Sequence, residues 1–222
     1  MNLKILYALL ILVTTLSFGA SENVFAQEKQ SAKKFNAELE NDFQKGAAGD
    51  EAALARAVKA SEEILAVNPK DARTLVWRGA VGLSQAGKAF RSGNFAEGGE
   101  IWQKALDNMK SAVEIEPDNV SIRMIRAAVL STAAKQFPAP DVARTLREIV
   151  IADYERVLIL TNENFKTMPE KLRQQILSGL ADAYDKIGDK TKARVFYRRL
   201  VDETSEAGKT RENALEWLKV DN

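Results

Sequence analysis

The chain has 222 residues and an almost balanced charge, with 32 Lys and Arg against 31 Asp and Glu. Balanced charge supplies no overall field to attract nucleic acid, so no nucleic-acid partner is expected. Cysteine and histidine are both absent, which excludes disulfides, Cys/His zinc sites, and Cys–His or Ser–His–Asp catalysis. A site built from carboxylates or lysine alone is still compatible with this composition. We expect a protein without enzymatic activity, cofactor or metal, whose stability depends on an apolar core.

The first segment, residues 1–26, has the pattern of a secretory signal. Lys4 precedes an uncharged, mostly aliphatic run from Ile5 to Ser21, and Val24-Phe25-Ala26 follows it. Signal peptidase reads small or branched residues at such positions, so we expect cleavage after Ala26 and a periplasmic or secreted product. The alternative is a membrane anchor, but a span takes roughly 20 apolar residues and this run is shorter. The mature chain is thus not expected to span a membrane.

Beyond residue 26, apolar residues recur at spacings of three and four, which is the period of amphipathic helices. This period predicts an all-α protein. The connections are short, which favours antiparallel helix hairpins. The helices are expected at Phe35–Gln44, Glu51–Val67, Ala72–Phe90, Phe95–Ile115, Val120–Gln136, Val142–Leu160, Glu170–Ile187, Lys190–Glu203 and Thr210–Lys219.

Several expected helix ends carry a residue that is suited to the position. Asp71, Asn119 and Asp141 are expected to cap the helices that follow them, because a short polar side chain can accept a hydrogen bond from the first turn. Pro169 suits a first helical turn, which lacks backbone partners in any case. Gly188 suits a position just after a helix, where the backbone turns left-handed.

Two proline-led segments, Pro69 to Gly79 and Pro117 to Ala127, are similar to each other. In each, a capping residue follows the proline, and an arginine and a tiny residue then stand side by side. A tiny residue allows a neighbouring helix to approach closely. The similarity predicts related helix pairs along the chain.

The segment from Leu180 to Leu200 resembles a tetratricopeptide repeat, because large and tiny residues alternate there as that family requires. The resemblance implies stacked helix hairpins over residues 50–203, of the kind found in divergent exported bacterial members. Residues 27–49 would form an N-terminal segment with a short helix, and residues 204–222 would form a C-terminal capping helix. The positions with a structural role in the repeat would be Gly79, Ala105, Leu180, Ala181, Tyr184, Gly188, Ala193 and Tyr197.

Repeat spacing departs from the family in two places. Pro69 and Pro117 lie further apart than the roughly 34-residue repeat of the family, and the surplus falls between Gly79 and Ala105. Both helices of that hairpin are therefore expected to be longer by about two turns each. A second surplus surrounds the segment 137–140. The predicted architecture is an irregular α-solenoid with two extended hairpins.

In the family, the first helix of each pair lines a concave groove that holds a peptide. The resemblance therefore implies a protein-binding groove, although its positions lack the basic cluster that would capture a chain-terminal carboxylate. By alignment, the groove positions are Arg73, Val76, Ala80, Leu83, Ser121, Met124, Ala128, Gln175, Ser178, Asp182 and Asp185.

Other conspicuous side chains admit two interpretations. Trp77, Trp102 and Trp217 suit binding hot spots, but their helical spacing favours packing. The basic residues Lys190, Arg194, Arg198 and Arg199 share a helix face that suits either an anionic partner or solvent. Asp182 and Asp185 invite comparison with a catalytic acid and base pair, but we do not expect catalysis, because both lie on one expected helix without a pocket or partner to separate their pKa values.

These features predict a non-catalytic scaffold of the cell envelope that binds a protein or peptide of unknown identity. The alternative is a solute- or lipid-binding accessory of an envelope transport system, in which the extended hairpins close over a cavity. Self-association into a structural oligomer is a third possibility.

Overall fold

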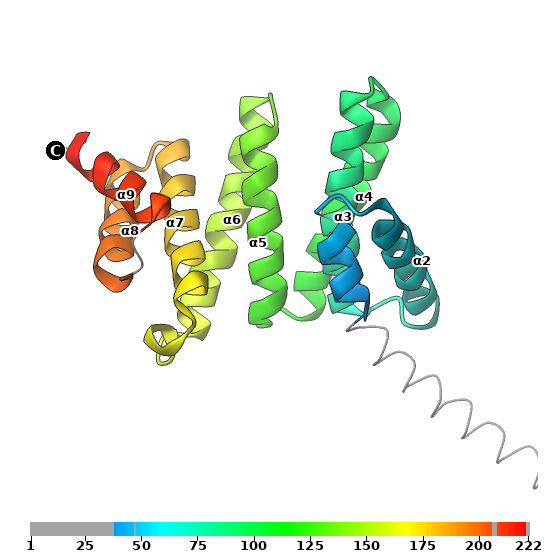
Figure 1. Ribbon diagram of the computed structural model, residues 1–222, viewed down its shortest axis with the longest axis horizontal. Coiled ribbons are helices and arrows are strands. Elements are labelled where there is room, and N and C mark those ends of the chain that lie inside the picture. Colours follow the sequence, from blue (N-terminus) through cyan, green and yellow to red (C-terminus); the bar gives the residue numbers. More distant parts are fainter. Residues whose placement is uncertain (1–37, 47, 206–207, 221–222) are drawn as a thin grey trace, which may run out of the picture. The chain divides into compact units, whose positions relative to one another are not determined.

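The computed structural model describes residues 38–46, 48–205 and 208–220, and over these residues the protein is helical and contains no strand (Figure 1). The all-helical prediction is thus confirmed for the described chain. The expected signal segment, and the expected start of the first helix at Phe35, lie outside the described residues.

The chain divides into two compact units between Pro69 and Lys70, inside the range expected for the repeats. The first unit contains a helical segment over residues 38–46 and helix α2 (Glu51–Val67). Asp50 caps α2 by accepting a hydrogen bond from the Ala53 amide at 2.9 Å. Arg56 of α2 binds Asp42 of the preceding segment, with an Nη2–Oδ1 distance of 2.7 Å.

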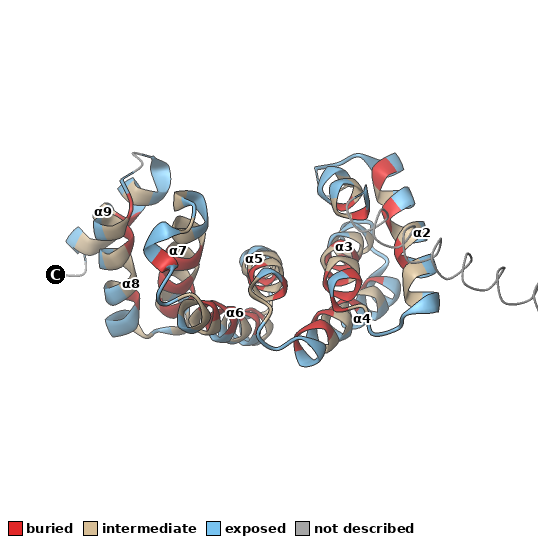
Figure 2. Ribbon diagram, turned by 90° about the horizontal axis from the view of Figure 1, so that it is seen from below, coloured by how far each residue is buried: buried red, intermediate tan, exposed pale blue. Residues whose placement is uncertain are grey.

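The second unit contains the remaining helices, and consecutive helices pack against each other as hairpins. The pairs are α3 with α4, α5 with α6, and α7 with α8; α9 then packs on α8, and α6 on α7. Figure 2 shows buried residues on the facing sides of these pairs. The helices are α3 (Ala72–Arg91), α4 (Phe95–Ile115), α5 (Val120–Gln136), α6 (Pro140–Leu160), α7 (Glu170–Ile187), α8 (Lys190–Glu203) and α9 (Lys209–Val220), with a short 3-10 turn, η1 (Phe165–Thr167).

Most predicted helix ends are confirmed. Asp71 accepts a hydrogen bond from the Thr74 amide at 2.8 Å, and Asn119 accepts one from the Ile122 amide at 3.2 Å. Gly188 ends α7 with a left-handed φ of 94°. The prediction for Asp141 is wrong, because α6 begins at Pro140, whose ring fixes φ and removes one amide that would need a partner.

The helices of the α3–α4 hairpin have 20 and 21 residues, against 17 and 21 in α5 and α6 and 18 and 14 in α7 and α8. Helices α3 and α4 touch at Gly79, where an added Cβ would lie 2.4 Å from the Met109 Cγ and 2.7 Å from the Ala105 carbonyl oxygen. A Cβ at Gly82 would lie 2.8 Å from the Ala105 Cβ. The tiny residues are therefore what permits this close approach.

Helices α5 and α6 are joined by an ion cluster that the sequence reading missed. Asp153 is fully buried and accepts hydrogen bonds from Arg126 Nε at 2.6 Å, Arg126 Nη2 at 2.8 Å and Arg123 Nη1 at 2.7 Å. Charge-assisted hydrogen bonds of this kind are roughly twice as strong as neutral ones. The cluster therefore fixes the register of the hairpin.

The last hairpin, α7 with α8, is packed closely on its inner side. Leu180, Ala181, Tyr184 and Ala193 are all buried, and their role as repeat positions stays a prediction. A Cβ at Gly179 would lie 2.4 Å from the Tyr154 ring, so α6 and α7 also approach closely.

Candidate binding groove along helix α7

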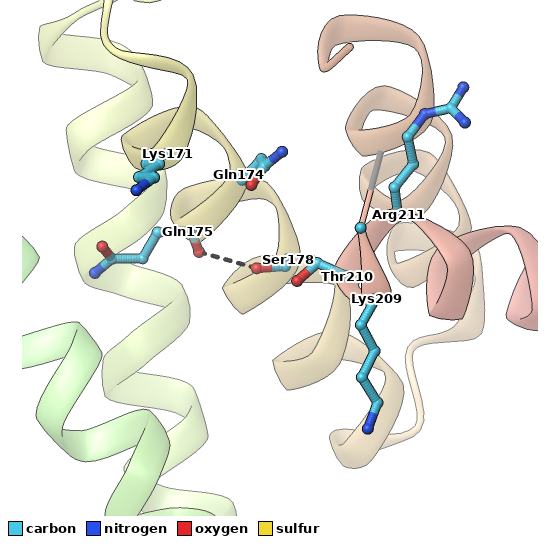
Figure 3. Close-up of a pocket in the computed structure, with 8 residues that line it drawn as sticks. Lys171, Gln174, Gln175, Ser178, Lys209, Thr210 and Arg211 are labelled. Atoms are coloured by element: carbon cyan, nitrogen blue, oxygen red, sulfur yellow. Dashed lines mark hydrogen bonds between the residues drawn. The ribbon is translucent and has the colours of Figure 1, made fainter. Parts of the chain in front are cut away.

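A polar cavity of about 410 Å³ separates the first half of α7 from the start of α9 (Figure 3). Four side chains project from successive turns of α7, and the other wall is the first turn of α9. Helical periodicity explains why the four side chains of α7 line the same wall, because positions three and four apart share a helix face. The lining residues are Lys171, Gln174, Gln175, Ser178, Gly208, Lys209, Thr210 and Arg211.

A second cavity of about 340 Å³ continues along α7 towards α5. It shares Gln175, Ser178 and Thr210 with the first cavity, so the two form one groove, here called the α7 groove. The second part adds residues from α5, α7, α8 and α9, namely Ala128, Ser131, Lys135, Gly179, Asp182, Tyr197, Leu200 and Asn213.

Charge is distributed unevenly along the α7 groove. Lys171, Lys209 and Arg211 line its first part, where no acidic side chain is among the lining residues. In the second part, Lys135 and Asp182 face each other at 3.4 Å and neutralise each other. One end of the groove is therefore cationic and the other is neutral and polar.

The two basic side chains at the start of α9, Lys209 and Arg211, differ in how far they are fixed by contacts within the protein. The Arg211 guanidinium is drawn back over α8, where Nη2 donates to the Val201 carbonyl oxygen at 3.4 Å. Lys209 is exposed and extends to the opposite side of α9 from Arg211 (Figure 3). Lys171 and Lys209 are thus the cations that can swing towards a bound anion most easily.

Hydrogen-bonding groups line the middle of the groove. Gln175 donates through Nε2 to the Tyr154 hydroxyl at 3.3 Å, which leaves its side-chain oxygen available to a ligand. Burial raises the pKa of Tyr154, so this phenol stays protonated and neutral. The Ser178 hydroxyl donates to the Gln175 backbone carbonyl at 3.4 Å (Figure 3). These groups can position a peptide backbone by hydrogen bonds.

Asp185, a predicted groove residue, contacts the docked helix α9. Its side chain is only 7% exposed, and it accepts hydrogen bonds from Lys190 at 2.6 Å and from the Trp217 indole at 2.9 Å. Burial alone would raise its pKa, but these bonds and the one from Lys186 outweigh burial and lower it. Trp217 also packs on Tyr197, with ring centroids 4.6 Å apart.

The basic stripe of α8 takes part in the same docking. Lys190 and Arg194 lie over the Trp217 ring at 5.4 and 5.8 Å from its centroid. Arg199 binds Glu203 at 2.6 Å. Much of the stripe is therefore occupied within the chain, although binding of an anionic partner to it stays a prediction.

The other predicted groove positions are scattered. Val76, Leu83 and Met124 are buried and contribute to packing, whereas Arg73 and Ser121 are exposed. The structure brings Ala128, Gln175, Ser178 and Asp182 together in the α7 groove. A binding role for any of these positions stays a prediction.

The groove residues that were not predicted come both from the expected repeats and from the last helix. Lys171 lies within the expected repeats but not at an aligned groove position. Lys209, Thr210 and Arg211 belong to the helix that was expected only to cap the stack. The one available signal was the basic character of residues 209–211. It did not indicate which helix they would face.

Comparison with protein-family models and with curated proteins finds no match for the sequence. Within residues 38–46, 48–205 and 208–220, no helix is both long and apolar enough to cross a membrane. The same residues hold no group of three or more acidic side chains arranged to bind a metal ion. A function must therefore be argued from the geometry of the surface.

Proposed function

We propose that the protein is a non-catalytic scaffold of the cell envelope that binds an extended segment of another protein in the α7 groove. The observation that carries this proposal is the continuity of two polar cavities along one helix. From Lys171 to Asp182 the helix advances about 16 Å at 1.5 Å per residue. An extended peptide rises about 3.3 Å per residue, so the groove matches about five residues.

The charge pattern indicates the kind of segment that fits. The cationic end of the groove complements acidic side chains, and the end with Lys135 and Asp182 complements neutral polar ones. Complementary charge speeds association and selects among partners more than it adds affinity. We therefore expect a segment with two or three acidic residues at one end, bound less well at high salt.

The proposal includes a tetratricopeptide-like stack as the scaffold and export as its route. The hairpins formed by α3 to α8 and the close contact at Gly79 support the stack. The sequence of residues 1–26 supports export and cleavage after Ala26. In such a stack the groove residues can vary without disturbing the packing beneath them.

The test is selection of peptides from a random display library on the chain that begins at Gln27. Thr210, exposed and shared by both cavities, offers a blocking site: Thr210→Trp would fill the junction without entering the core. Thr191→Trp is a matched control, since Thr191 is also the exposed second residue of a helix, outside the groove. We expect acidic peptides whose binding falls at least about tenfold in the Thr210 variant and is unchanged in the control.

Charge reversal tests the predicted polarity separately. Lys171→Glu with Lys209→Glu should abolish selection of acidic peptides, while Lys104→Glu with Lys219→Glu should not, because these exposed lysines lie outside the groove. Selected peptides that bind the Thr210 variant as well as the original protein would overturn the proposal.

A second candidate function is a solute- or lipid-binding accessory of an envelope transport system. One observation favours it, an apolar cavity at the end of the α3–α4 hairpin.

A further inference from the structure

Four aromatic rings meet where the α3–α4 turn lies beside the α5–α6 turn, at the same end of the second unit (Figure 1). Phe90 lies in the last turn of α3, Phe95 begins α4, Trp102 lies two turns further on, and Phe137 follows α5. Ring centroids are 4.7 Å apart for Trp102 and Phe137, and 6.3 to 6.5 Å apart for Phe90 and each of the other three rings. The turn of the α3–α4 hairpin and the residue that follows α5, which is distant in the sequence, thus build one aromatic cluster.

The cluster lines a cavity of about 310 Å³ that is open to solvent on one side. Its walls are almost wholly apolar, in contrast to the α7 groove. Gly87 lies in the wall that α3 contributes to this cavity, and it has no side chain to fill the cavity. The lining residues are Leu83, Gly87, Phe90, Arg91, Phe95, Trp102, Ala133, Gln136, Phe137 and Pro138.

The aromatic cluster is incompletely covered by the protein itself. Phe95 is 71% exposed, and Phe90, Trp102 and Phe137 are only half-buried. Each square ångström of apolar surface left in water forgoes hydrophobic stabilisation, so a molecule that covers these rings gains it on binding. Contiguous exposed apolar surface of this kind marks binding sites more often than isolated exposed side chains do.

One cation stands at the edge of the cavity. Arg91 is exposed, and it forms no ion pair within the part of the chain that the structure describes. Its guanidinium lies back along α3, since a Cβ built on Gly87 would be 3.3 Å from Nη1. Gln136 is the other polar residue of the lining. An apolar cavity thus has a single positive charge at its edge and no acidic lining residue.

We propose that this cavity binds a small amphiphilic carboxylic acid, a single apolar chain or ring that carries one carboxylate. The apolar body lies against Trp102 and Phe137, and the carboxylate pairs with the Arg91 guanidinium, whose planar fork matches it. A volume of about 310 Å³ is at the lower end for ligand sites, so the cavity suits one chain better than the two chains of a lipid. The site shares no residue with the α7 groove and does not rest on the proposed peptide binding.

The test is calorimetric titration of the chain from Gln27 with octanoate and with octanol, which have the same chain length and differ in charge at pH 7. We expect saturable binding of one octanoate and weaker binding of octanol. Arg91→Gln should weaken octanoate binding by about two- to fivefold, as exposed ion pairs do, and leave octanol binding unchanged.

Two glycines of the long hairpin provide a filling variant and its control. Gly87→Leu places a side chain in the cavity, and the nearest obstacle is the mobile end of Arg91. Gly99→Leu places the same side chain on α4 in open space. Both changes replace a helical glycine and favour the helix, so loss of binding in the first alone cannot be attributed to unfolding.

We expect Gly87→Leu to abolish octanoate binding, and Gly99→Leu and the groove variant Thr210→Trp to retain it. Octanoate binding that survives Gly87→Leu, equal binding of octanol and octanoate, or no saturable heat at millimolar octanoate would each overturn the inference. Thr210→Trp blocks only the α7 groove, so it tests peptide binding without affecting octanoate binding. Failure of the peptide proposal therefore leaves the octanoate results unchanged, and failure of the octanoate proposal leaves the peptide results unchanged.

Discussion

Replacement of the buried Asp153 by asparagine is the change that tests the packing of the second unit most directly. The carboxylate is fully buried, and both its oxygens accept hydrogen bonds, from two guanidinium groups whose side chains are 13% exposed. Asparagine has the same shape but presents an NH₂ group where one oxygen accepted a bond. At least one donor of Arg126 or Arg123 would then face another donor, and both cations would lose their counter-charge.

Removing one partner from a buried ion pair costs about 3–5 kcal/mol, because the remaining charge stays buried without compensation. For a domain of this size, each kcal/mol lowers the thermal midpoint by about 2–4 °C. We therefore expect Asp153→Asn to lower the midpoint by roughly 6–20 °C. Thermal and urea unfolding of the chain from Gln27, followed by circular dichroism at 222 nm, a standard helix signal, would measure the change.

The chain supplies a matched control for this experiment. Asp118 binds Arg156 at 2.6 Å, but the two side chains are 59% and 39% exposed. Exposed pairs contribute about 0–1 kcal/mol, so Asp118→Asn should leave the midpoint almost unchanged. If Asp153→Asn were no more destabilising than Asp118→Asn, the cluster would not hold α5 and α6 together as argued.

Three further predictions concern stability. Gly79→Ala should lower the free energy of unfolding, measured with urea, by about 1–3 kcal/mol, because its Cβ would meet α4. Gly99→Ala, where the Cβ would lie in open space, should raise it by up to about 1 kcal/mol. Equal effects of the two changes would contradict the close contact at Gly79. Gly188→Ala should lower the thermal midpoint, because a left-handed φ of 94° costs an L-residue about 1–2 kcal/mol; an unchanged midpoint would argue against this turn. The pKa of Asp185 is lower in the folded protein than its ordinary value of about 3.8. The ionised carboxylate therefore contributes fully to the free energy of unfolding above pH 3.8, and this contribution is lost as the pH falls through the pKa of the folded protein. The difference in urea midpoint between the original protein and Asp185→Asn should therefore be present at pH 5 and shrink below pH 3.8; a difference that grows on acidification would refute the assignment.

Much of the local structure was predictable from the sequence. The predicted bounds of α2, α4, α5, α7 and α8 are confirmed, whereas α3 and α6 differ by one or two residues at one end and α9 by one residue at each end. Periodicity and capping act over a few residues, so a linear reading detects them. Asp141 was misassigned because Pro140 also suits a helix start, and the helix begins at this proline, two residues before the predicted start at Val142.

The candidate sites were harder to predict, since each depends on helices that are distant in the sequence. Met124 and Val76 were assigned to a groove by alignment, but they are buried; α3 packs on both α4 and α5, which leaves less free surface than the alignment implied. Asp153 did carry a signal, because it stands beside the apolar positions Val150, Tyr154 and Val157 and is buried with them. An acid inside an apolar stripe requires a partner, although the sequence does not identify that partner.

By itself, the sequence determined the helical class, nearly all helix ends and the lack of Cys/His chemistry, because helix periodicity, caps and composition are local or additive properties. The sequence also showed that Gly79 was suited to a close contact. Only the tertiary structure decided that α9 would turn its first residues towards α7, and that Phe90, Trp102 and Phe137 would meet around a cavity. Both outcomes depend on how whole helices pack, and that packing is the sum of many weak contacts between distant residues.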